Sequence, residues 1–220
     1  ASATQINIYL EDGGLKLIKV DDDGLGMDDA DATLAFQRHA TSKIYRDDDL
    51  FFIDTLGFRG EALPSIASVS EVVLETCQQD IGTMIHIKGG ILLDKSPSNA
   101  RVGTRITITN LFYNTPARLK YLKSEQTELA NTTAFIEKLA LAKPNIAFTL
   151  TNNNNVVVKT SGSNNLLKTI HEIYGLNVSS KMLEIKGLND DFEIKGFVCK
   201  PEILKSNRNH LITFINGRVV

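Results

Sequence analysis

Short segments in which apolar and polar residues alternate recur along most of the chain, and this period of two restricts the possible folds more than any other feature. Residues 4–12 alternate in this way, and residues 15–20 repeat the pattern directly after Gly13-Gly14. Alternation predicts a β-strand with one buried face, and a glycine pair between two such strands predicts a tight turn. The chain therefore begins with a predicted β-hairpin.

Other segments carry the spacing and the end signals of helices. Asp28 or Asp29 can cap a helix that follows, and Pro144 closes a long amphipathic one because proline cannot continue a helix. Four asparagines in a row form the turn of a later hairpin, since asparagine tolerates positive φ. We predict helices over residues 30–41, after Gly60, over 124–143 and over 165–175, and further strands over 70–77, 82–94, 103–112, 146–160, 182–201 and 210–217.

The order of these elements defines the fold class and a domain boundary. Helices and antiparallel hairpins alternate without a repeat, which predicts an α+β protein. A length of 220 residues allows one domain or two. A fresh run of strands begins after residues 175–180, so we predict one domain over residues 1–176 and the start of a second over residues 177–220.

Composition excludes several classes of protein. The apolar runs are far too short to span a membrane. Cys77 and Cys199 have no metal-ligand spacing, which favours a reduced, cytoplasmic setting over a disulfide framework. The chain begins in strand-like sequence without an initiator methionine, so we expect it to be a piece of a longer protein.

Charge is unevenly distributed although the net charge is only −2. Residues 1–54 hold twelve Asp or Glu against five Lys or Arg, a net charge of −7. Residues 81–124 hold seven Lys or Arg against one Asp, a net charge of +6. Such asymmetry is typical of a side that faces a polyanion, and equally of solvated charges spread over different faces.

The segment "VDDDGLGMDD" follows a predicted strand and contains Asp22, Gly24 and Gly26 in a D-x-G-x-G pattern. An aspartate at a strand end can accept a hydrogen bond from an exocyclic amine, and nearby glycines let a flat ring approach the backbone. The alternative is an ordinary acidic turn. A calcium loop is excluded, because setting Gly26 at its sixth position puts Leu25 and Ala32 where oxygen ligands are required.

Two further segments offer contacts for phosphate. In "GFRGEALPSI", Pro64 restricts the helix start to the region of Glu61, which leaves backbone N–H groups between Arg59 and Leu63 without intrahelical partners. With the helix dipole they can bind an anion, or they form a tight turn without a ligand. The hydroxyls and lysine of "TSK", residues 41–43, are candidate phosphate contacts or helix C-terminal caps.

Taken in order, "VDDDGLG", "RHATSK", "GFRGEAL" and "GTRITITNLFYNTPAR" resemble the N-terminal ATPase region of the MutL family of DNA mismatch-repair proteins. The resemblance covers nearly the whole chain, and "GFRGEAL" and "FYNTPAR" are highly specific to that family. The wider GHKL group includes gyrase, a heat-shock chaperone and histidine kinases, whose shared signals are looser. A topoisomerase or chaperone of that group is a distant alternative, because neither carries "FYNTPAR".

The resemblance implies a fold and a set of site residues. The fold is a two-layer sandwich of a mixed, largely antiparallel sheet with helices on one face, followed by the start of an α+β domain like domain 2 of ribosomal protein S5. Asp22 would bind the adenine amino group, and Gly24 and Gly26 would shape the site for the ring. Thr104 would support Asp22 and the adenine through water. The implied phosphate contacts are Thr41, Ser42, Lys43, Arg59, Gly60, Glu61, Ala62 and Leu63.

The resemblance also implies that the catalytic groups lie elsewhere. The glutamate general base and the asparagine that holds Mg²⁺ would precede Ala1, and a lysine that reaches the γ-phosphate would follow Val220. The 220-residue chain is therefore predicted to contain no catalytic residue and no metal ligand, and not to hydrolyse ATP by itself.

The implied partners are ATP with Mg²⁺, DNA, a second copy that joins on ATP binding, and other mismatch-repair proteins, but no membrane. We expect a bacterial cytoplasmic protein that joins the nucleoid during repair. Two hypotheses remain open. In the first, ATP hydrolysis drives a repair cycle; in the second, the chain is a nucleotide-gated module that dimerises and holds DNA without turnover. DNA binding should be weak and non-specific, with Arg101, Arg105, Arg118, Lys120 and Lys123 as candidates.

Overall fold

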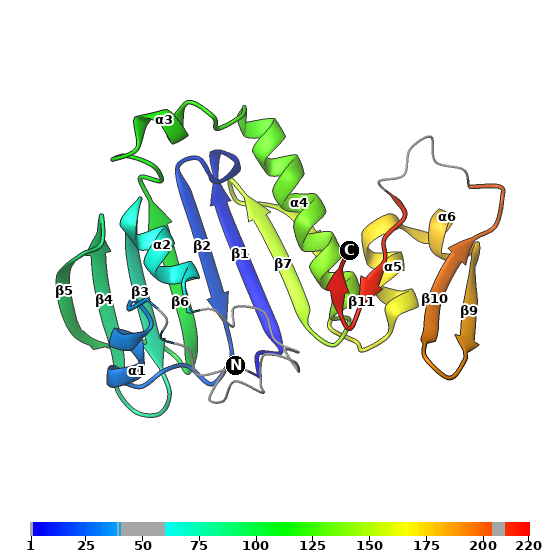
Figure 1. The fold of residues 1–220 in the computed structure, drawn as a ribbon, viewed down its shortest axis with the longest axis horizontal. Helices are drawn as coiled ribbons and strands as arrows, with labels where there is room; N and C mark the ends of the chain where they lie inside the picture. The colour runs from blue at the N-terminus through cyan, green and yellow to red at the C-terminus, as the bar shows by residue number, and fades with distance from the viewer. Residues whose placement is uncertain (1, 39, 41–59, 204–209) are drawn as a thin grey trace.

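The computed structural model describes residues 2–38, 40, 60–203 and 210–220. Its main element is an eight-stranded sheet in the order β5-β4-β3-β6-β2-β1-β7-β8 (Figure 1). The β1–β7 pair is parallel and the other neighbours are antiparallel, which confirms a mixed, largely antiparallel sheet. The strands are β1 (Gln5–Glu11), β2 (Leu17–Asp22), β3 (Glu71–Cys77), β4 (Gly82–Lys88), β5 (Ile91–Ser98), β6 (Gly103–Thr109), β7 (Ala147–Asn152) and β8 (Asn155–Lys159).

Turn chemistry explains two of the hairpins. The β1–β2 turn is a short 3-10 segment, η1 (Asp12–Gly14), in which Gly13 has a φ of +66°. A Cβ on Gly13 would lie 2.5 Å from the backbone oxygen of Glu125, so a larger residue does not fit. In the β7–β8 turn Asn153 and Asn154 both adopt positive φ, as the asparagine run predicts.

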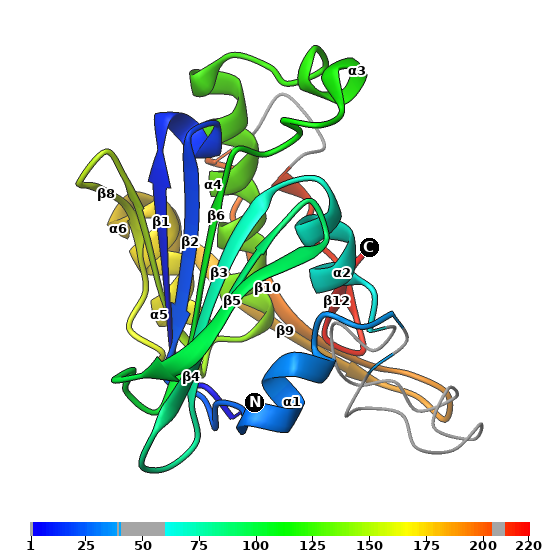
Figure 2. The same cartoon turned by 90° about the vertical axis from the view of Figure 1, so that its left-hand side faces the viewer.

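The longest helix and the two that precede β3 lie on one face of the sheet, whereas the short helix over Pro116–Leu119 lies beyond one end of the sheet (Figures 1 and 2). Asp28 caps the first helix by accepting a hydrogen bond from Asp31 N at 2.7 Å, as predicted. That helix ends at Leu34, not near residue 41, because the chain continues in turns closed by hydrogen bonds between residues three positions apart. The helices are α1 (Asp29–Leu34), α2 (Ala62–Ser68), α3 (Pro116–Leu119), α4 (Glu125–Ala142), α5 (Leu166–Tyr174) and α6 (Leu176–Ser179).

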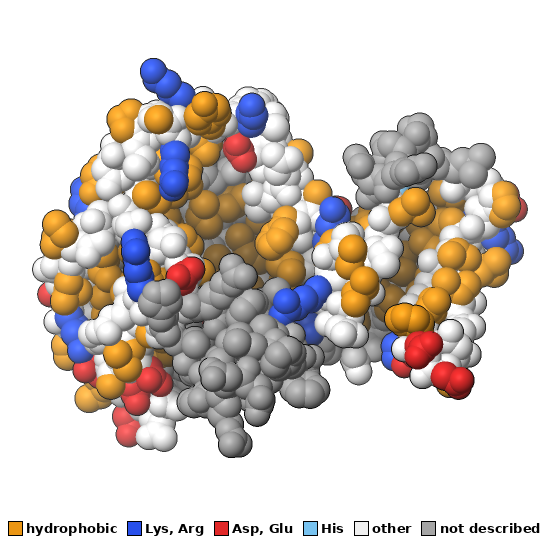
Figure 3. All heavy atoms as spheres, viewed as in Figure 1, with side chains coloured by type: hydrophobic (Ala, Val, Ile, Leu, Met, Phe, Trp, Pro, Cys, Tyr) orange, Lys and Arg blue, Asp and Glu red, His pale blue; other side chains and the backbone are white. Residues whose placement is uncertain are grey.

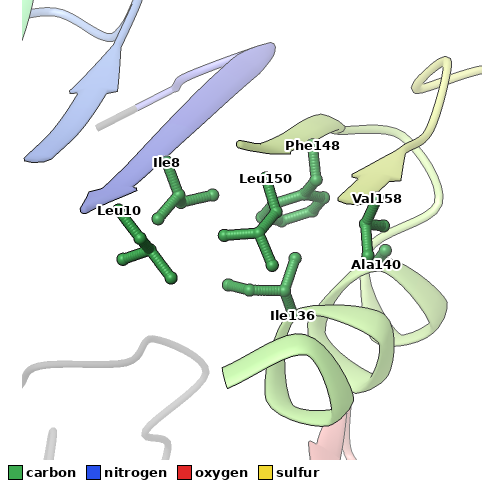
Figure 4. Packing of buried hydrophobic residues seen from close by; sticks show 7 residues of the cluster. All are labelled: Ile8, Leu10, Ile136, Ala140, Phe148, Leu150 and Val158. Atoms are coloured by element: carbon green, nitrogen blue, oxygen red, sulfur yellow. The ribbon is translucent and has the colours of Figure 1, made fainter. Parts of the chain in front are cut away.

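Two apolar clusters join these helices to the sheet. Under α4, side chains of β1, β7 and β8 pack against the helix (Figure 4). The cluster consists of Ile8, Leu10, Phe148, Leu150 and Val158 from the strands and Ile136 and Ala140 from α4. Under α1 and α2 the second cluster consists of Ala32, Ala67, Val72, Leu74, Ile85, Ile87 and Ile108. Cross-strand partners run from Ile8 through Val20 and Ile106 to Leu74, so both clusters lie on the same face. The fold is a two-layer α+β sandwich.

The remaining strands follow α6. They are β9 (Met182–Leu188) and β10 (Glu193–Cys199), which form an antiparallel hairpin, and the short pair β11 (Phe214–Ile215) and β12 (Arg218–Val219). The boundary set between residues 176 and 177 falls inside α6 and stays a prediction. Among the described residues, no helix combines the length and the apolar character that a membrane crossing requires.

The open face of the sheet carries a compact polar cluster around Glu71. Its carboxylate lies 2.9 Å from His86 Nε2 and 2.9 Å from Lys88 Nζ, and it accepts a hydrogen bond from Asn110 Nδ2 at 3.1 Å. Hydrogen bonds from Lys88 and then His86 lower the pKa of Glu71 from 4.5 to about 2. The charged form is therefore favoured by folding, and its contribution to stability is complete above about pH 4.5.

Replacing Glu71 should cost stability in a pH-dependent way. We expect Glu71→Gln to lower the free energy of unfolding by about 1 kcal/mol at pH 7, a value reduced for solvent screening at a partly exposed site. The difference should shrink as the pH falls from 4.5 toward 2, where Glu71 itself becomes protonated. Urea unfolding at several pH values measures it, with Glu75→Gln as the matched control, because Glu75 has a single ionic contact at 3.9 Å. A constant difference across this range contradicts the assignment.

Candidate functional site

Three consecutive aspartates stand at the end of β2, and each has a different neighbour. Asp21 lies on the open face, where it accepts hydrogen bonds from Nη2 and Nε of Arg105 at 2.7 and 3.2 Å. Asp23 holds the start of β1 by accepting hydrogen bonds from Thr4 N at 2.7 Å and Thr4 Oγ1 at 2.5 Å. Asp22 contacts neither Arg105 nor Thr4, so it is the aspartate of the three that is available for a ligand.

Asp22 faces the helical layer, because it lies two residues after Val20, which packs against the core on that side. Its Oδ1 accepts a hydrogen bond from Gly24 N at 2.9 Å, and among the described residues this is the only donor to the carboxylate. Burial raises the pKa of Asp22, the Gly24 bond lowers it, and the neighbouring aspartates raise it further. The net pKa is raised, so a donor from a ligand would relieve a partly desolvated carboxylate.

The loop after β2 folds back onto the ends of β3 and β6. Gly26 has a φ of +67°, and a Cβ there would lie 1.9 Å from the carbonyl oxygen of Cys77. Only glycine fits this approach. Met27 then donates its N–H to Thr76 Oγ1 at 2.9 Å, and the Thr76 hydroxyl donates to Gly103 O at 3.0 Å. A single hydroxyl thus joins the loop to two strands.

Thr104 joins the same network beside Asp22. The two residues are Cα partners between β6 and β2, and Thr104 Oγ1 lies 3.2 Å from Thr76 Oγ1. Gly103 has a φ of +124°, and a Cβ there would lie 2.1 Å from the backbone oxygen of Asp22. The structure therefore brings Asp22 and Thr104 together with the glycine loop at one end of the sheet.

A hollow lies on this face of the sheet between α2 and α4. Figure 3 shows it with hydrophobic side chains on its floor. In β2 and β6, Ile18, Val20 and Ile106 pack beside the two clusters but are only partly buried. An apolar floor with one carboxylate at its edge suits a flat ring that carries an amino group.

The described part of the glycine-containing loop leads into α2. Gly60 has a φ of +62°, and a Cβ there would lie 2.2 Å from the backbone oxygen of Ala40. The first intrahelical hydrogen bond runs from Ser65 N to Glu61 O at 3.1 Å, and Pro64 has no N–H. The N–H groups of residues 61–63 thus precede the first intrahelical donor, as the sequence predicts for the helix start.

Four predicted phosphate contacts lie outside the described residues; they are Thr41, Ser42, Lys43 and Arg59. Their roles, and those of Gly60, Glu61, Ala62 and Leu63, stay predictions. Within residues 2–38, 40, 60–203 and 210–220, no group of three or more His, Cys, Asp or Glu side chains could hold a metal ion.

The predicted DNA contacts do not form one surface. Arg105 is bound to Asp21 on the open face, and this hydrogen bond raises its pKa. Arg101 precedes the first residue of β6, whereas Arg118 lies in α3 beyond the other end of that strand. A seven-residue strand spans about 20 Å, so these cations lie at opposite ends of the sheet.

Two residues that position the loop of the site were not identified from the sequence. Thr76 and Gly103 hold the loop around Gly26, yet each is separated from it by about fifty residues or more. A threonine at a strand end is common, and only the pairing of β3 with β6 puts its hydroxyl under the loop. The glycine of "GTR" gives the available hint, since it directly precedes Thr104.

The fold defines a class of protein. The structure matches the ATPase domain of Aquifex aeolicus MutL complexed with ADP at a TM-score of 0.73 and 25% identity, over 99% of this chain and 75% of that one. The N-terminal domain of a DNA repair protein matches in fold, with a TM-score of 0.81 and 22% identity over 99% of this chain and 69% of that one. The chain has the fold of the GHKL ATPase domains.

Sequence relatives narrow this class. The chain is 50% identical over 220 residues to the DNA mismatch repair protein MutL of Lactiplantibacillus plantarum, covering 100% of this chain and 32% of that protein. It is also 50% identical over 222 residues to MutL of Lactococcus lactis subsp. cremoris, covering 34% of that protein. A family model described as DNA mismatch repair protein, C-terminal domain, matches residues 170–220. The whole chain is homologous to MutL and spans about a third of the length of these relatives.

Proposed function

We propose that this chain is the ATP-binding region of a DNA mismatch-repair ATPase, in which ATP binding, dimerisation and hydrolysis are coupled to repair. The homology to MutL and to an ADP-bound MutL ATPase domain supports the class of reaction. The observation that carries the proposal is the setting of Asp22, a partly desolvated carboxylate with one internal donor at the edge of an apolar hollow. No observation on the described residues favours a module without turnover over this proposal.

In the proposed complex Asp22 accepts a hydrogen bond from the adenine amino group. The ring lies over the partly buried apolar floor, and Gly24 and Gly26 keep the adjacent backbone clear of side chains. Thr104 supports both partners from the neighbouring strand, through water. These groups bind and orient the base, and none of them takes part in the cleavage of the phosphate bond.

The phosphates are proposed to lie toward the start of α2. The N–H groups of Gly60, Glu61, Ala62 and Leu63 would contact their oxygens, together with Thr41, Ser42, Lys43 and Arg59. Mg²⁺ would neutralise charge on the phosphates. Its asparagine and the general base are proposed to lie outside this chain.

The other partners follow from the proposed role. We propose that ATP binding promotes pairing of two copies, that DNA is held weakly and without sequence preference, and that other repair proteins bind. Such a protein would act in the bacterial cytoplasm, at the nucleoid. Arg101, Arg105, Arg118, Lys120 and Lys123 remain the proposed DNA contacts, and Arg105 already forms an ion pair with Asp21.

The adenine contact is tested by one substitution with a matched control. In the full-length protein, Asp22→Asn should weaken ATP binding by about 10- to 150-fold, because hydrogen bonds to charged groups contribute roughly 1.5–3 kcal/mol. Calorimetric titration of ATP measures the change. Asp21→Asn removes the neighbouring charge on the opposite face and should change the affinity far less. Equal losses in the two variants would remove Asp22 from the site.

A further inference from the structure

The segment between β6 and α4 carries several cations, and the nearest acidic residues in the sequence are Glu125 and Glu128 at the start of α4, where Glu128 Oε1 accepts a hydrogen bond from Lys123 N at 2.8 Å. Residues 95–124 contain no aspartate or glutamate. Arg118, Lys120 and Lys123 are exposed, and across the described part of the chain none of them forms an ion pair. Arg105, which the same segment supplies to the sheet, is neutralised by Asp21. Three unpaired cations within six residues leave a local positive field that suits an anionic partner.

Tyr121 lies within this run of cations with its side chain in solvent. It is 79% exposed, more than the other exposed aromatic residues of the described chain, of which Phe192 at 69% is next. No ring contact or side-chain hydrogen bond ties Tyr121 to another described residue. The ring therefore contributes little to packing and is accessible to a ligand.

The backbone under Tyr121 is well held. Its N–H donates to Arg118 O at 3.0 Å, and Lys120 N donates to Pro116 O at 3.2 Å. At the other end of the segment, Phe112 N donates to Val69 O at 2.6 Å, which anchors it to the domain. Figures 1 and 3 show α3 projecting at the end of the sheet, with cationic and hydrophobic side chains on its surface. The ring and the cations thus share one projecting tip.

We propose that this tip, residues 118–123, binds single-stranded DNA, with Tyr121 stacked on an unpaired base and Arg118, Lys120 and Lys123 on the flanking phosphates. The proposal rests on the proposed role in DNA repair. Stacking requires a base whose face is uncovered, and in a duplex the neighbouring base pairs cover both faces. Phosphate contacts alone do not distinguish single strands from duplexes, so Tyr121 supplies the preference.

Fluorescence anisotropy with a labelled oligothymidine and with a labelled duplex of equal length tests the proposal. In the full-length protein, Tyr121→Ala should weaken binding of the single strand by about 5- to 150-fold, the range for loss of one base–aromatic stack. Binding of the duplex should change by less than about 2-fold, as phosphate contacts remain. Tyr121→Phe keeps the ring and should bind as the parent does. Phe135→Ala is the matched control, because Phe135 is 59% exposed on α4, away from the tip.

Charge reversal distinguishes base stacking by Tyr121 from DNA binding through phosphate contacts alone. Arg118→Glu with Lys120→Glu should weaken both DNA forms and flatten the dependence of affinity on salt. If that double variant weakens DNA binding but Tyr121→Ala has no effect, the stacking proposal is wrong and the tip holds DNA by phosphates alone. If neither variant affects DNA, the tip is no DNA site. If the double variant instead weakens binding of a polyglutamate peptide only, the partner is an acidic protein surface.

Discussion

Phosphate release by the 220-residue chain should stay at the background rate of ATP in buffer. Hydrolysis requires a base that activates water, a bound Mg²⁺, and positive charge on the transferring phosphate. In the proposed function, the general base, the Mg²⁺ ligand and the lysine at the γ-phosphate are not residues of this chain. Loss of a general base alone costs about 10²–10⁴-fold in rate, and here three contributions are removed together.

A phosphate-release assay compares this chain with the full-length protein, which should turn over slowly. Asp22 does not replace the base, because its proposed contact is at the adenine end of the site. Glu61 lies nearer to the proposed phosphate position, so Glu61→Gln is the informative variant. Turnover by the 220-residue chain that disappears in Glu61→Gln would show that the base has been assigned wrongly.

Local sequence patterns predict the strands of this fold well. Alternation places β1 and β2 within a residue or two, and the asparagine run predicts the β7–β8 turn. The order of the strands in the sheet is harder to predict from the sequence than their positions in the chain. The parallel pairing of β1 with β7 joins segments about 140 residues apart, and no local pattern encodes it. The resemblance to a known family, not the periodicity, supplies the two-layer arrangement.

The helix after Asp28 shows where a local pattern is overruled by packing. Apolar residues continue at helical spacing to residue 40, yet α1 ends at Leu34. Phe36 packs against the second apolar cluster, and Gln37 N donates to Leu34 O at 2.8 Å in a four-residue turn. Contacts with the sheet fix the end of this helix, so its sequence overestimates its length.

The sequence predicts the candidate site in part. Asp22, Gly24 and Gly26 follow from their motif and Thr104 from the family resemblance, and the four residues lie together at one end of the sheet. Charge density predicts Arg105 as a DNA contact, but the structure pairs it with Asp21, 84 residues earlier in the chain. A run of like charge says nothing about pairing across a sheet, because register decides which side chains face each other.

A second large effect concerns the preference for adenine over guanine as the nucleobase of the ligand. A carboxylate accepts a hydrogen bond from the amino group of adenine, but guanine presents its O6 acceptor at that position. Two acceptors then face each other, and the Asp22 carboxylate stays partly desolvated without a donor. Sites built around one hydrogen bond reject an analogue that lacks it by about 10⁴-fold when fully buried. Asp22 is half-buried, so we expect ATP to be preferred over GTP by a factor on the order of 10³.

Calorimetric titration of ATP and GTP into the full-length protein and into Asp22→Asn tests the central claim most directly. The side-chain amide that this substitution introduces can donate to guanine O6, so the change should weaken ATP binding and strengthen GTP binding together. The account predicts that the preference for ATP falls by at least about 10-fold, and that Asp21→Asn leaves it unchanged. An equal preference for ATP in the parent and in Asp22→Asn would show that Asp22 does not contact the base.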